Sequence, residues 1–258
     1  MERVGSKYAR ELFNSKINES EWTTALKSYE SAISKISQQK NKPELIHLDK
    51  FWRVELREAI LSRDPKHITL EEISKVMKWK LIRGKARPLQ KLVDSNPASA
   101  VIADSTKALE QLSLGHWQKA IEAISNLKGS IPNCNPPINI NYFHSGIGVA
   151  TATAVLSCMA PDLVPFMADE AIEAATNLKR DYTLKTYCAV RSSLVEKARE
   201  LGDRWTAELV GRALWAKSVL PYPESEPCPA SGEIAASNNG GEKKRKSDQE
   251  AKPKKQKR

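Results

Sequence analysis

A glycine turn that runs into an alanine-rich helix is the feature that most constrains this chain. Gly146-Ile147-Gly148 leads directly into the apolar stretch VATATAVLS at 149–157. Glycine admits positive φ and lets a ligand approach the backbone. The helix that follows places unpaired amide N–H groups and the positive end of its dipole at the turn. The segment therefore predicts an anion-binding helix N-terminus, although a tight turn before a core helix fits the same residues.

The order and spacing of the residues after this turn resemble the helix-hairpin-helix DNA glycosylase superfamily. Thr151-Ala152 and an apolar helix follow the turn, then Val164-Pro165, and Asp169 stands 23 positions after Gly146. In that superfamily the hairpin amides bind a DNA phosphate, and an aspartate lies at the mouth of the pocket that receives a flipped base. The resemblance covers residues 117–171 without 130–146, and it implies an all-α, multi-helix bundle.

The resemblance also implies which residues touch DNA and which carry the chemistry. Asp169 matches the aspartate that stabilises the cationic sugar and orients the attacking water, with Glu170 as the alternate acid. An acid at that place is also a common helix cap, and this alternative stays open. The hairpin residues implied to hold phosphate are Gly129, Gly146, Ile147, Gly148, Ala150 and Thr151.

Two departures from the family pattern bear on activity. Bifunctional members carry a Schiff-base lysine two residues after the second hairpin glycine, and this chain has Ala150 there. Strand cleavage by that route is therefore not expected, which leaves a monofunctional glycosylase or a protein that binds without catalysis. Phe166, Met167 and Ala168 also separate Val164-Pro165 from Asp169, where the family usually has at most one residue.

An inserted segment splits the hairpin motif. Leu127-Lys128-Gly129 ends the first arm, but the matching Ile147-Gly148 comes 17 residues later. Residues 130–146, which include His144, are rich in Pro and Asn and show no helical periodicity. Either Gly146 takes the place of Gly129 and the insert forms a long loop, or the turn is deformed and its phosphate site weakened.

A cationic stretch at 78–88 is the second candidate for contact with DNA. It holds five Lys or Arg, one Trp and no acid, a composition that suits a phosphate backbone beside an exposed base. Alternatively, Trp79 belongs to the core and the cations complement a helix C-terminus. The phosphate-binding candidates are Lys80, Arg83, Lys85 and Arg87, with the last three expected to face outward.

Helical periodicity dominates the rest of the chain, and no strand pattern is present. Residues 1–19 carry little signal and are taken as an N-terminal extension, so the all-α domain spans 20–220. Ser20 is the expected N-cap of the first helix, and Thr69 with Glu72 has capping-box spacing. Helices are predicted over 20–36, 48–62, 69–79, 88–93, 98–112, 117–127, 149–159, 169–175, 184–201 and 205–218.

The composition changes at Pro221 and predicts a disordered tail over 221–258. Residues 242–258 hold nine Lys or Arg against three acids, and the whole chain has a formal charge of +10. These cations form two clusters, at 243–246 and 252–258. The clusters predict a nuclear-localisation signal, with a non-specific nucleic-acid arm as the alternative. The signal comprises Lys243, Lys244, Arg245, Lys246, Lys254, Lys255, Lys257 and Arg258.

Other classes of function are disfavoured by what the sequence lacks. The four cysteines are 24 to 40 residues apart, which predicts reduced thiols and neither a zinc site nor the iron–sulfur cluster of some glycosylases. We expect no metal and no small-molecule cofactor. The N-terminus has no signal-peptide pattern and no apolar run reaches ~18 residues, so a soluble intracellular protein is expected.

The first hypothesis is a nuclear DNA-binding protein that resembles monofunctional base-excision glycosylases. Its expected partners are double-stranded DNA and a nuclear import receptor, with no membrane. The alternative is a non-catalytic protein that keeps the fold to bind DNA or chromatin. A third hypothesis is a helical interaction protein whose Gly-Ile-Gly turn is only structural.

Overall fold

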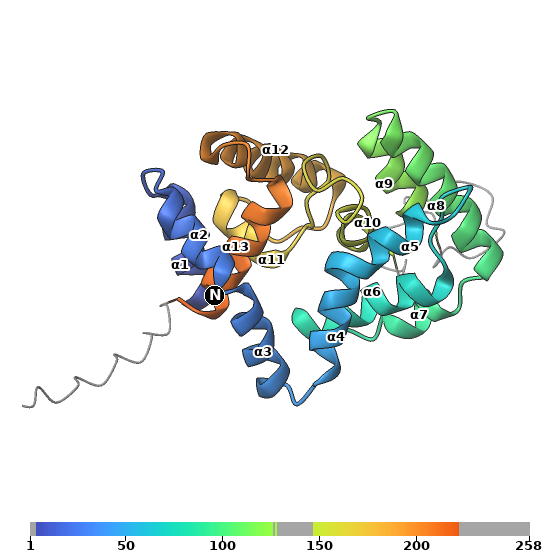
Figure 1. Cartoon of the computed structure of the whole chain (residues 1–258), viewed down its shortest axis with the longest axis horizontal. Coiled ribbons are helices and arrows are strands. Elements are labelled where there is room, and N and C mark those ends of the chain that lie inside the picture. The colour runs from blue at the N-terminus through green and yellow to red at the C-terminus, as the bar shows by residue number, and fades with distance from the viewer. Residues whose placement is uncertain (1–3, 126, 128–146, 222–258) are drawn as a thin grey trace, which may run out of the picture. The chain divides into compact units, whose positions relative to one another are not determined.

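The computed structural model describes residues 4–125, 127 and 147–221, and all regular structure in these ranges is helical (Figure 1). The all-α class predicted from periodicity is confirmed. The helices are α1 (Val4–Asn14), α2 (Glu19–Lys27), α3 (Tyr29–Gln39), α4 (Glu44–Lys50), the π-helical turn η1 (Phe51–Glu55), α5 (Leu56–Leu61), α6 (Leu70–Arg83), α7 (Gln90–Asp94), α8 (Ala98–Ser113), α9 (Trp117–Ser125), α10 (Val149–Leu156), α11 (Asp169–Ala175), α12 (Leu184–Leu201) and α13 (Ala207–Val219).

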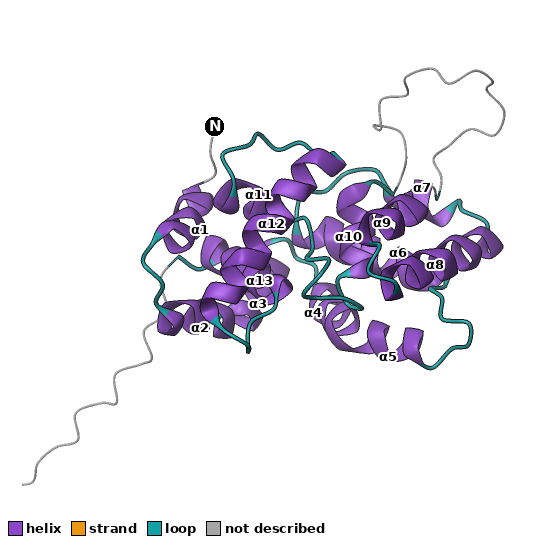
Figure 2. Ribbon diagram, turned by 90° about the horizontal axis from the view of Figure 1, so that it is seen from above, coloured by secondary structure: helices purple, strands orange, loops and turns teal. Residues whose placement is uncertain are grey.

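The helices form two groups, which Figure 2 shows side by side. In the first group, α13 packs against α1, α2, α3, α11 and α12. In the second group, α6 contacts α4, α7, α8 and α10, and α9 packs on both α8 and α10. The chain passes through the first group, crosses to the second at α4, and returns at α11. The segment between α10 and α11, residues 157–168, therefore joins the second group to the first.

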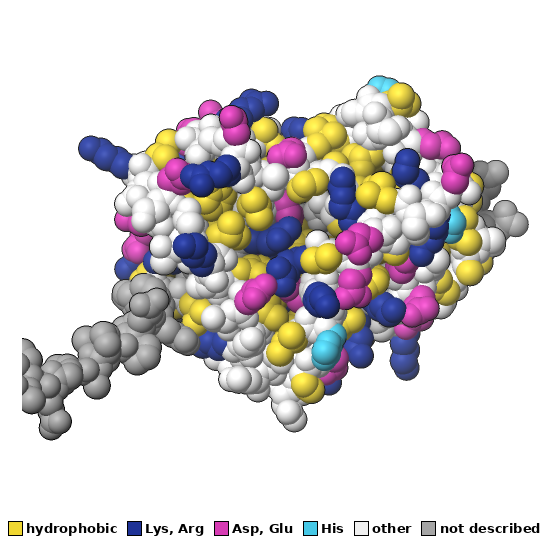
Figure 3. Space-filling model, in the orientation of Figure 1, with side chains coloured by type: hydrophobic (Ala, Val, Ile, Leu, Met, Phe, Trp, Pro, Cys, Tyr) yellow, Lys and Arg dark blue, Asp and Glu magenta, His cyan; other side chains and the backbone are white. Residues whose placement is uncertain are grey.

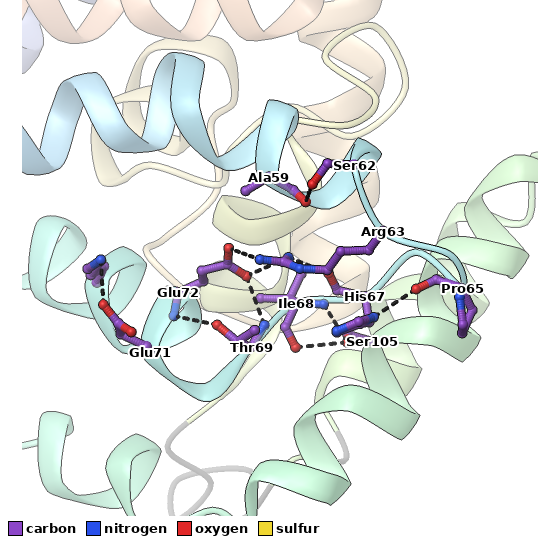
Figure 4. Close-up of polar contacts among 11 residues, drawn as sticks. Ala59, Ser62, Arg63, Pro65, His67, Ile68, Thr69, Glu71, Glu72 and Ser105 are labelled. Atoms are coloured by element: carbon purple, nitrogen blue, oxygen red, sulfur yellow. Dashed lines mark hydrogen bonds and ion pairs between the residues drawn. The ribbon is translucent and has the colours of Figure 1, made fainter.

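Local sequence signals define the start of α6 (Figure 4). The Thr69 hydroxyl accepts from the Glu72 amide, and the Glu72 carboxylate accepts from the Thr69 amide, as the capping-box spacing predicts. Arg63 adds two hydrogen bonds to Glu72, at 2.6 and 3.0 Å. Ser105 of α8 contacts the amide of Ile68. These contacts fix α6, which carries Lys80 toward the junction of the two groups.

An aromatic cluster fills the core beside that junction. Trp52 stacks on Trp79 with ring centroids 3.9 Å apart, and Phe166 packs against both rings. The Trp79 indole N–H donates to Asp49, which is 1% exposed. Trp79 is fully buried, so the alternative that assigned it to the core is correct and it offers no surface to a base.

The N-terminal segment departs from the sequence-based expectation. Residues 4–14 form α1, which contacts α11 and α13, so the segment belongs to the fold and is not an extension. The predicted helix over 20–36 is divided at Ser28, whose hydroxyl donates to the Ala25 carbonyl at 2.8 Å. A side chain that hydrogen-bonds the preceding turn competes with helix continuation. Asn18, and not Ser20, caps α2.

Several predictions concern residues that lie outside the described ranges. They include Gly129, the insert 130–146 with Gly146, and the whole basic tail with its proposed localisation signal. Within the described ranges, no helix is long and apolar enough to cross a membrane. No cluster of three or more His, Cys, Asp or Glu in those same ranges could hold a metal ion.

Candidate functional site

Asp169 is the first residue of α11, and its side chain is 17% exposed. The N-cap position belongs to Ala168. The Tyr182 hydroxyl donates to Oδ1 of Asp169 at 2.6 Å, and Nη1 of Arg180 lies 3.6 Å from Oδ2. The carboxylate thus faces the segment before α12, where a tyrosine and an arginine hold its orientation.

The segment that carries Arg180 and Tyr182 is tied to the N-terminal helix through Glu173. Nε of Arg180 lies 2.5 Å from Oε1 of Glu173. Ser6 of α1 donates to the Glu173 carboxylate, and Arg10 donates twice to its backbone carbonyl, at 2.8 and 3.0 Å. Helix α1 therefore supports the orientation of the residues that contact Asp169.

Arg87 reaches the same tyrosine from the loop after α6. Its Nη2 donates to the Tyr182 hydroxyl oxygen at 3.1 Å, and its guanidinium lies 5.0 Å from the ring centroid. Burial, together with the nearby Asp169 carboxylate, raises the pKa of Tyr182 to about 12. The phenol therefore stays protonated at neutral pH and continues to donate to Asp169.

Lys80 connects this site to the first turn of α10. Its ammonium donates to Oγ1 of Thr151 at 2.9 Å. Burial, and then the charge of Arg87, lower the pKa of Lys80 to about 8, while Asp169 partly opposes the shift. The network therefore consists of two hydrogen-bonded groups, Lys80 with Thr151 of α10 and Arg87 with Tyr182 and Asp169 of α11. The charges of Arg87 and Asp169 act on Lys80 and link the two groups.

We expect the lowered pKa of Lys80 to appear as a pH dependence of stability. Between pH 8 and the ordinary lysine pKa of 10.5, the unfolded state binds more protons than the folded state. The free energy of unfolding therefore rises with pH in this window. Replacing Lys80 with methionine should remove about 1 kcal/mol of that rise between pH 8 and 9.5. Urea titrations at the two pH values measure the difference.

Lys85 supplies the control for this prediction because it lies exposed in the loop after α6. A Lys85→Met variant should keep the full pH dependence of the wild-type chain. An equal rise of stability with pH in the Lys80→Met variant would show that the ammonium of Lys80 is not destabilised by its surroundings.

The start of α10 differs in one respect from the sequence-based picture. Gly148 is the N-cap residue with φ −95°, so its backbone does not use the positive φ that favours glycine. A Cβ at Gly148 would meet nothing within 4 Å. The amides of Val149 and Ala150 have no hydrogen-bond acceptor among the described residues. What glycine provides here is open space over the first amides of the helix.

The other predicted site residues divide into buried and exposed positions. Arg83 was expected to face outward, but it is only 6% exposed and lies among Trp79, Phe166 and Trp215, 4.2 Å from the last ring centroid. An arginine enclosed by three aromatic rings stabilises the core and cannot contact a phosphate backbone. Glu170, Ile147 and Ala150 are also buried, whereas Lys85 and Arg87 are exposed.

Sequence reasoning missed the residues that hold Asp169, namely Arg180, Tyr182 and Glu173. Their positions relative to Asp169 depend on how the segment after α11 turns back, which periodicity does not specify. A local signal was present in Arg180-Asp181-Tyr182, where a cation and a tyrosine immediately precede a capped helix.

The Asp169 site combines the charges needed to bind an anion beside a carboxylate. Arg180 pairs with the carboxylates of Asp169 and Glu173, Arg87 contacts the tyrosine that donates to Asp169, and Lys80 interacts with the charge of Asp169. Comparisons with models of protein families, with curated proteins and with solved structures gave no match. The function of the chain is therefore inferred from the chemistry of this site.

Proposed function

We propose that this chain is a DNA-binding protein in which α9 and α10 are the arms of a helix-hairpin-helix. The observation that carries the proposal is the network joining Thr151 at the start of α10 to Lys80, Arg87 and Asp169. A backbone phosphate would lie over the open surface at Gly148, beside the α10 amides and the cations. The basic tail would direct the chain to the nucleus through an import receptor.

We further propose that Asp169 acts on the sugar of a flipped nucleotide. The carboxylate, held by Tyr182 and Arg180, would stabilise positive charge on a deoxyribose and orient an attacking water. Base release without strand cleavage would follow, because Ala150 provides no amine for a Schiff base.

A second candidate is a protein that binds DNA on this surface without catalysis. It is favoured by the contacts of Asp169, since one carboxylate oxygen already accepts from Tyr182 and the other faces Arg180. A carboxylate with both oxygens engaged has less capacity to orient a water. The two candidates share the DNA surface and differ only in the role of Asp169.

The binding surface is tested by titrating duplex DNA at increasing salt. In a plot of the logarithm of the association constant against the logarithm of the salt concentration, each phosphate contact should add about −0.9 to the slope. Contacts from Lys80, Arg87 and Arg180 therefore predict a slope between about −2 and −3 for a chain ending at Glu224. Gly148→Ala should weaken binding about tenfold, the loss expected for one charge-assisted hydrogen bond, because the methyl group blocks approach to the amides.

The melting temperature separates this effect from unfolding, because a Cβ at Gly148 meets no neighbouring atom. The variant should melt as the wild type does. A salt-independent affinity, or equal affinity of Gly148→Ala and wild type, would argue against a phosphate at the start of α10.

A further inference from the structure

A cavity lies between η1, α5, α13 and the segment that follows α10. Its volume is about 470 Å³, within the range of pockets that hold small organic ligands. It shares no lining residue with the Asp169 site. Its side chains of interest are Trp52, Arg53, Arg57, Glu208 and Arg212. Figure 3 shows Lys and Arg side chains gathered at the centre of this face, between α13 and the helices α4 and α5.

The three arginines of the cavity differ in how far their charges are already paired. Arg53 is neutralised, since it contacts Asp49 at 2.7 Å and Glu30 at 3.1 Å. Arg57 uses one nitrogen to donate to the carbonyls of Cys158 and Met159. Among the described residues, no carboxylate pairs with Arg57. Its remaining nitrogens are free to bind an anion at the cavity wall.

Arg212 also keeps unused donors. Its Nε lies 3.5 Å from Oε1 of Glu208, and its guanidinium lies 5.4 Å from the Trp52 ring centroid. Its two terminal nitrogens have no hydrogen-bond partner in the described part of the chain. Oε2 of Glu208 accepts from the Phe166 amide at 2.6 Å, so this carboxylate is engaged with the backbone as well. Burial raises the pKa of Glu208.

The cavity is therefore preorganised for an oxyanion. Arg57 is held by two carbonyls and Arg212 by a tryptophan, so little side-chain freedom is lost on binding. Planar guanidinium groups match the geometry of phosphate. The turn η1, which supplies Trp52 and Arg53, is π-helical, a distortion that is frequent at functional sites.

The cavity keeps two available arginines, Arg57 and Arg212, because Arg53 is already paired with Asp49 and Glu30. Its two acids are Asp162 and Glu208. Asp162 is exposed to solvent, and no ion pair joins it to Arg57 or Arg212 among the described residues. Met159, Pro161 and Leu163 supply an apolar wall for the remainder of a ligand. A recessed site of this size favours a small molecule over the continuous backbone of a duplex.

We propose that this cavity binds a phosphorylated small molecule of about nucleotide size, with its phosphate held by Arg57 and Arg212. Arg53 and Glu208 line the cavity beside these arginines, and the apolar residues after α10 contact the organic part of the ligand. The site is independent of the function proposed for Asp169.

Calorimetric titration of the full-length chain tests the proposal with adenosine monophosphate, inorganic phosphate and adenosine as probes. We expect the two phosphate-bearing probes to bind and adenosine not to bind. Arg57→Gln and Arg212→Gln should each weaken binding by at least about tenfold, the loss of one charged hydrogen bond. Arg204→Gln is the matched control, because Arg204 is 84% exposed and outside the cavity, and it should bind as wild type does.

Each other outcome counts against the proposal. Failure of both phosphate-bearing probes to bind at millimolar concentration would overturn it, as would unchanged affinity in the Arg57→Gln variant. Arg57 is exposed, so that variant decides the matter even if Arg212→Gln does not fold. Displacement of adenosine monophosphate by a short duplex would assign the arginines to a DNA surface and would equally contradict a small-molecule site.

Discussion

Replacing Asp49 with alanine is expected to lower the free energy of unfolding by about 3–5 kcal/mol, the cost of breaking a buried ion pair. Asp49 is 1% exposed and accepts three hydrogen bonds. Tyr29 donates at 2.7 Å, the Trp79 indole at 3.0 Å and Arg53 at 2.7 Å. The substitution leaves the buried donors of Tyr29 and Trp79 unpaired and removes the buried carboxylate of Arg53, which keeps only the exposed Glu30.

Glu30 provides the matched control because it contacts the same arginine from the surface. Its side chain is 75% exposed, and exposed ion pairs contribute about 0–1 kcal/mol. Urea denaturation of wild type, Asp49→Ala and Glu30→Ala should therefore give one large and one small loss. A loss below about 1 kcal/mol for Asp49→Ala would contradict the role given to this network.

Asp169→Asn is expected to lower base release by roughly 10²- to 10⁴-fold, the contribution of a well-placed catalytic carboxylate. Asparagine keeps the size of the side chain and an oxygen that accepts from Tyr182, but it loses the negative charge that stabilises a cationic sugar. The measurement is single-turnover release of base from a panel of duplexes, each with one damaged or mismatched base.

Asp181→Asn is the control for this comparison. Asp181 is an exposed acid in the segment that carries Tyr182, and it accepts from the Thr183 hydroxyl. It should release base at the wild-type rate. Equal background from wild type and Asp169→Asn on every duplex would remove the catalytic proposal, while salt-dependent binding would keep the DNA-binding one.

Several helices could be predicted from the sequence because their signals are local. Thr69 with Glu72 forms the predicted capping box of α6, and α12 has the predicted bounds, 184–201. Helix α1 was not predicted, although Ala9 and Leu12, three positions apart, are both buried in it. Helix caps and apolar spacing depend only on residues within a few turns.

The candidate site was predictable only in part. The sequence singled out Lys80, Arg87, Thr151 and Asp169, and the structure joins them in one network. The sequence could not show that Arg83 is buried. Lys80 and Arg83 are close in the sequence, yet one faces Thr151 and the other is enclosed by aromatic rings. Which way each cation points depends on helices that are distant in the sequence.

The sequence by itself determined that the chain is helical, where most helices begin and end, and which stretches carry charge. Only the tertiary structure decided which charges come together, since Tyr182 and Arg180 reach Asp169 after α11 ends. Likewise, Arg57 of α5 and Arg212 of α13 line the same cavity. The physical reason is that helix formation depends on contacts between near neighbours. The surroundings of a buried charge are instead set by the packing of segments that belong to different helices and loops.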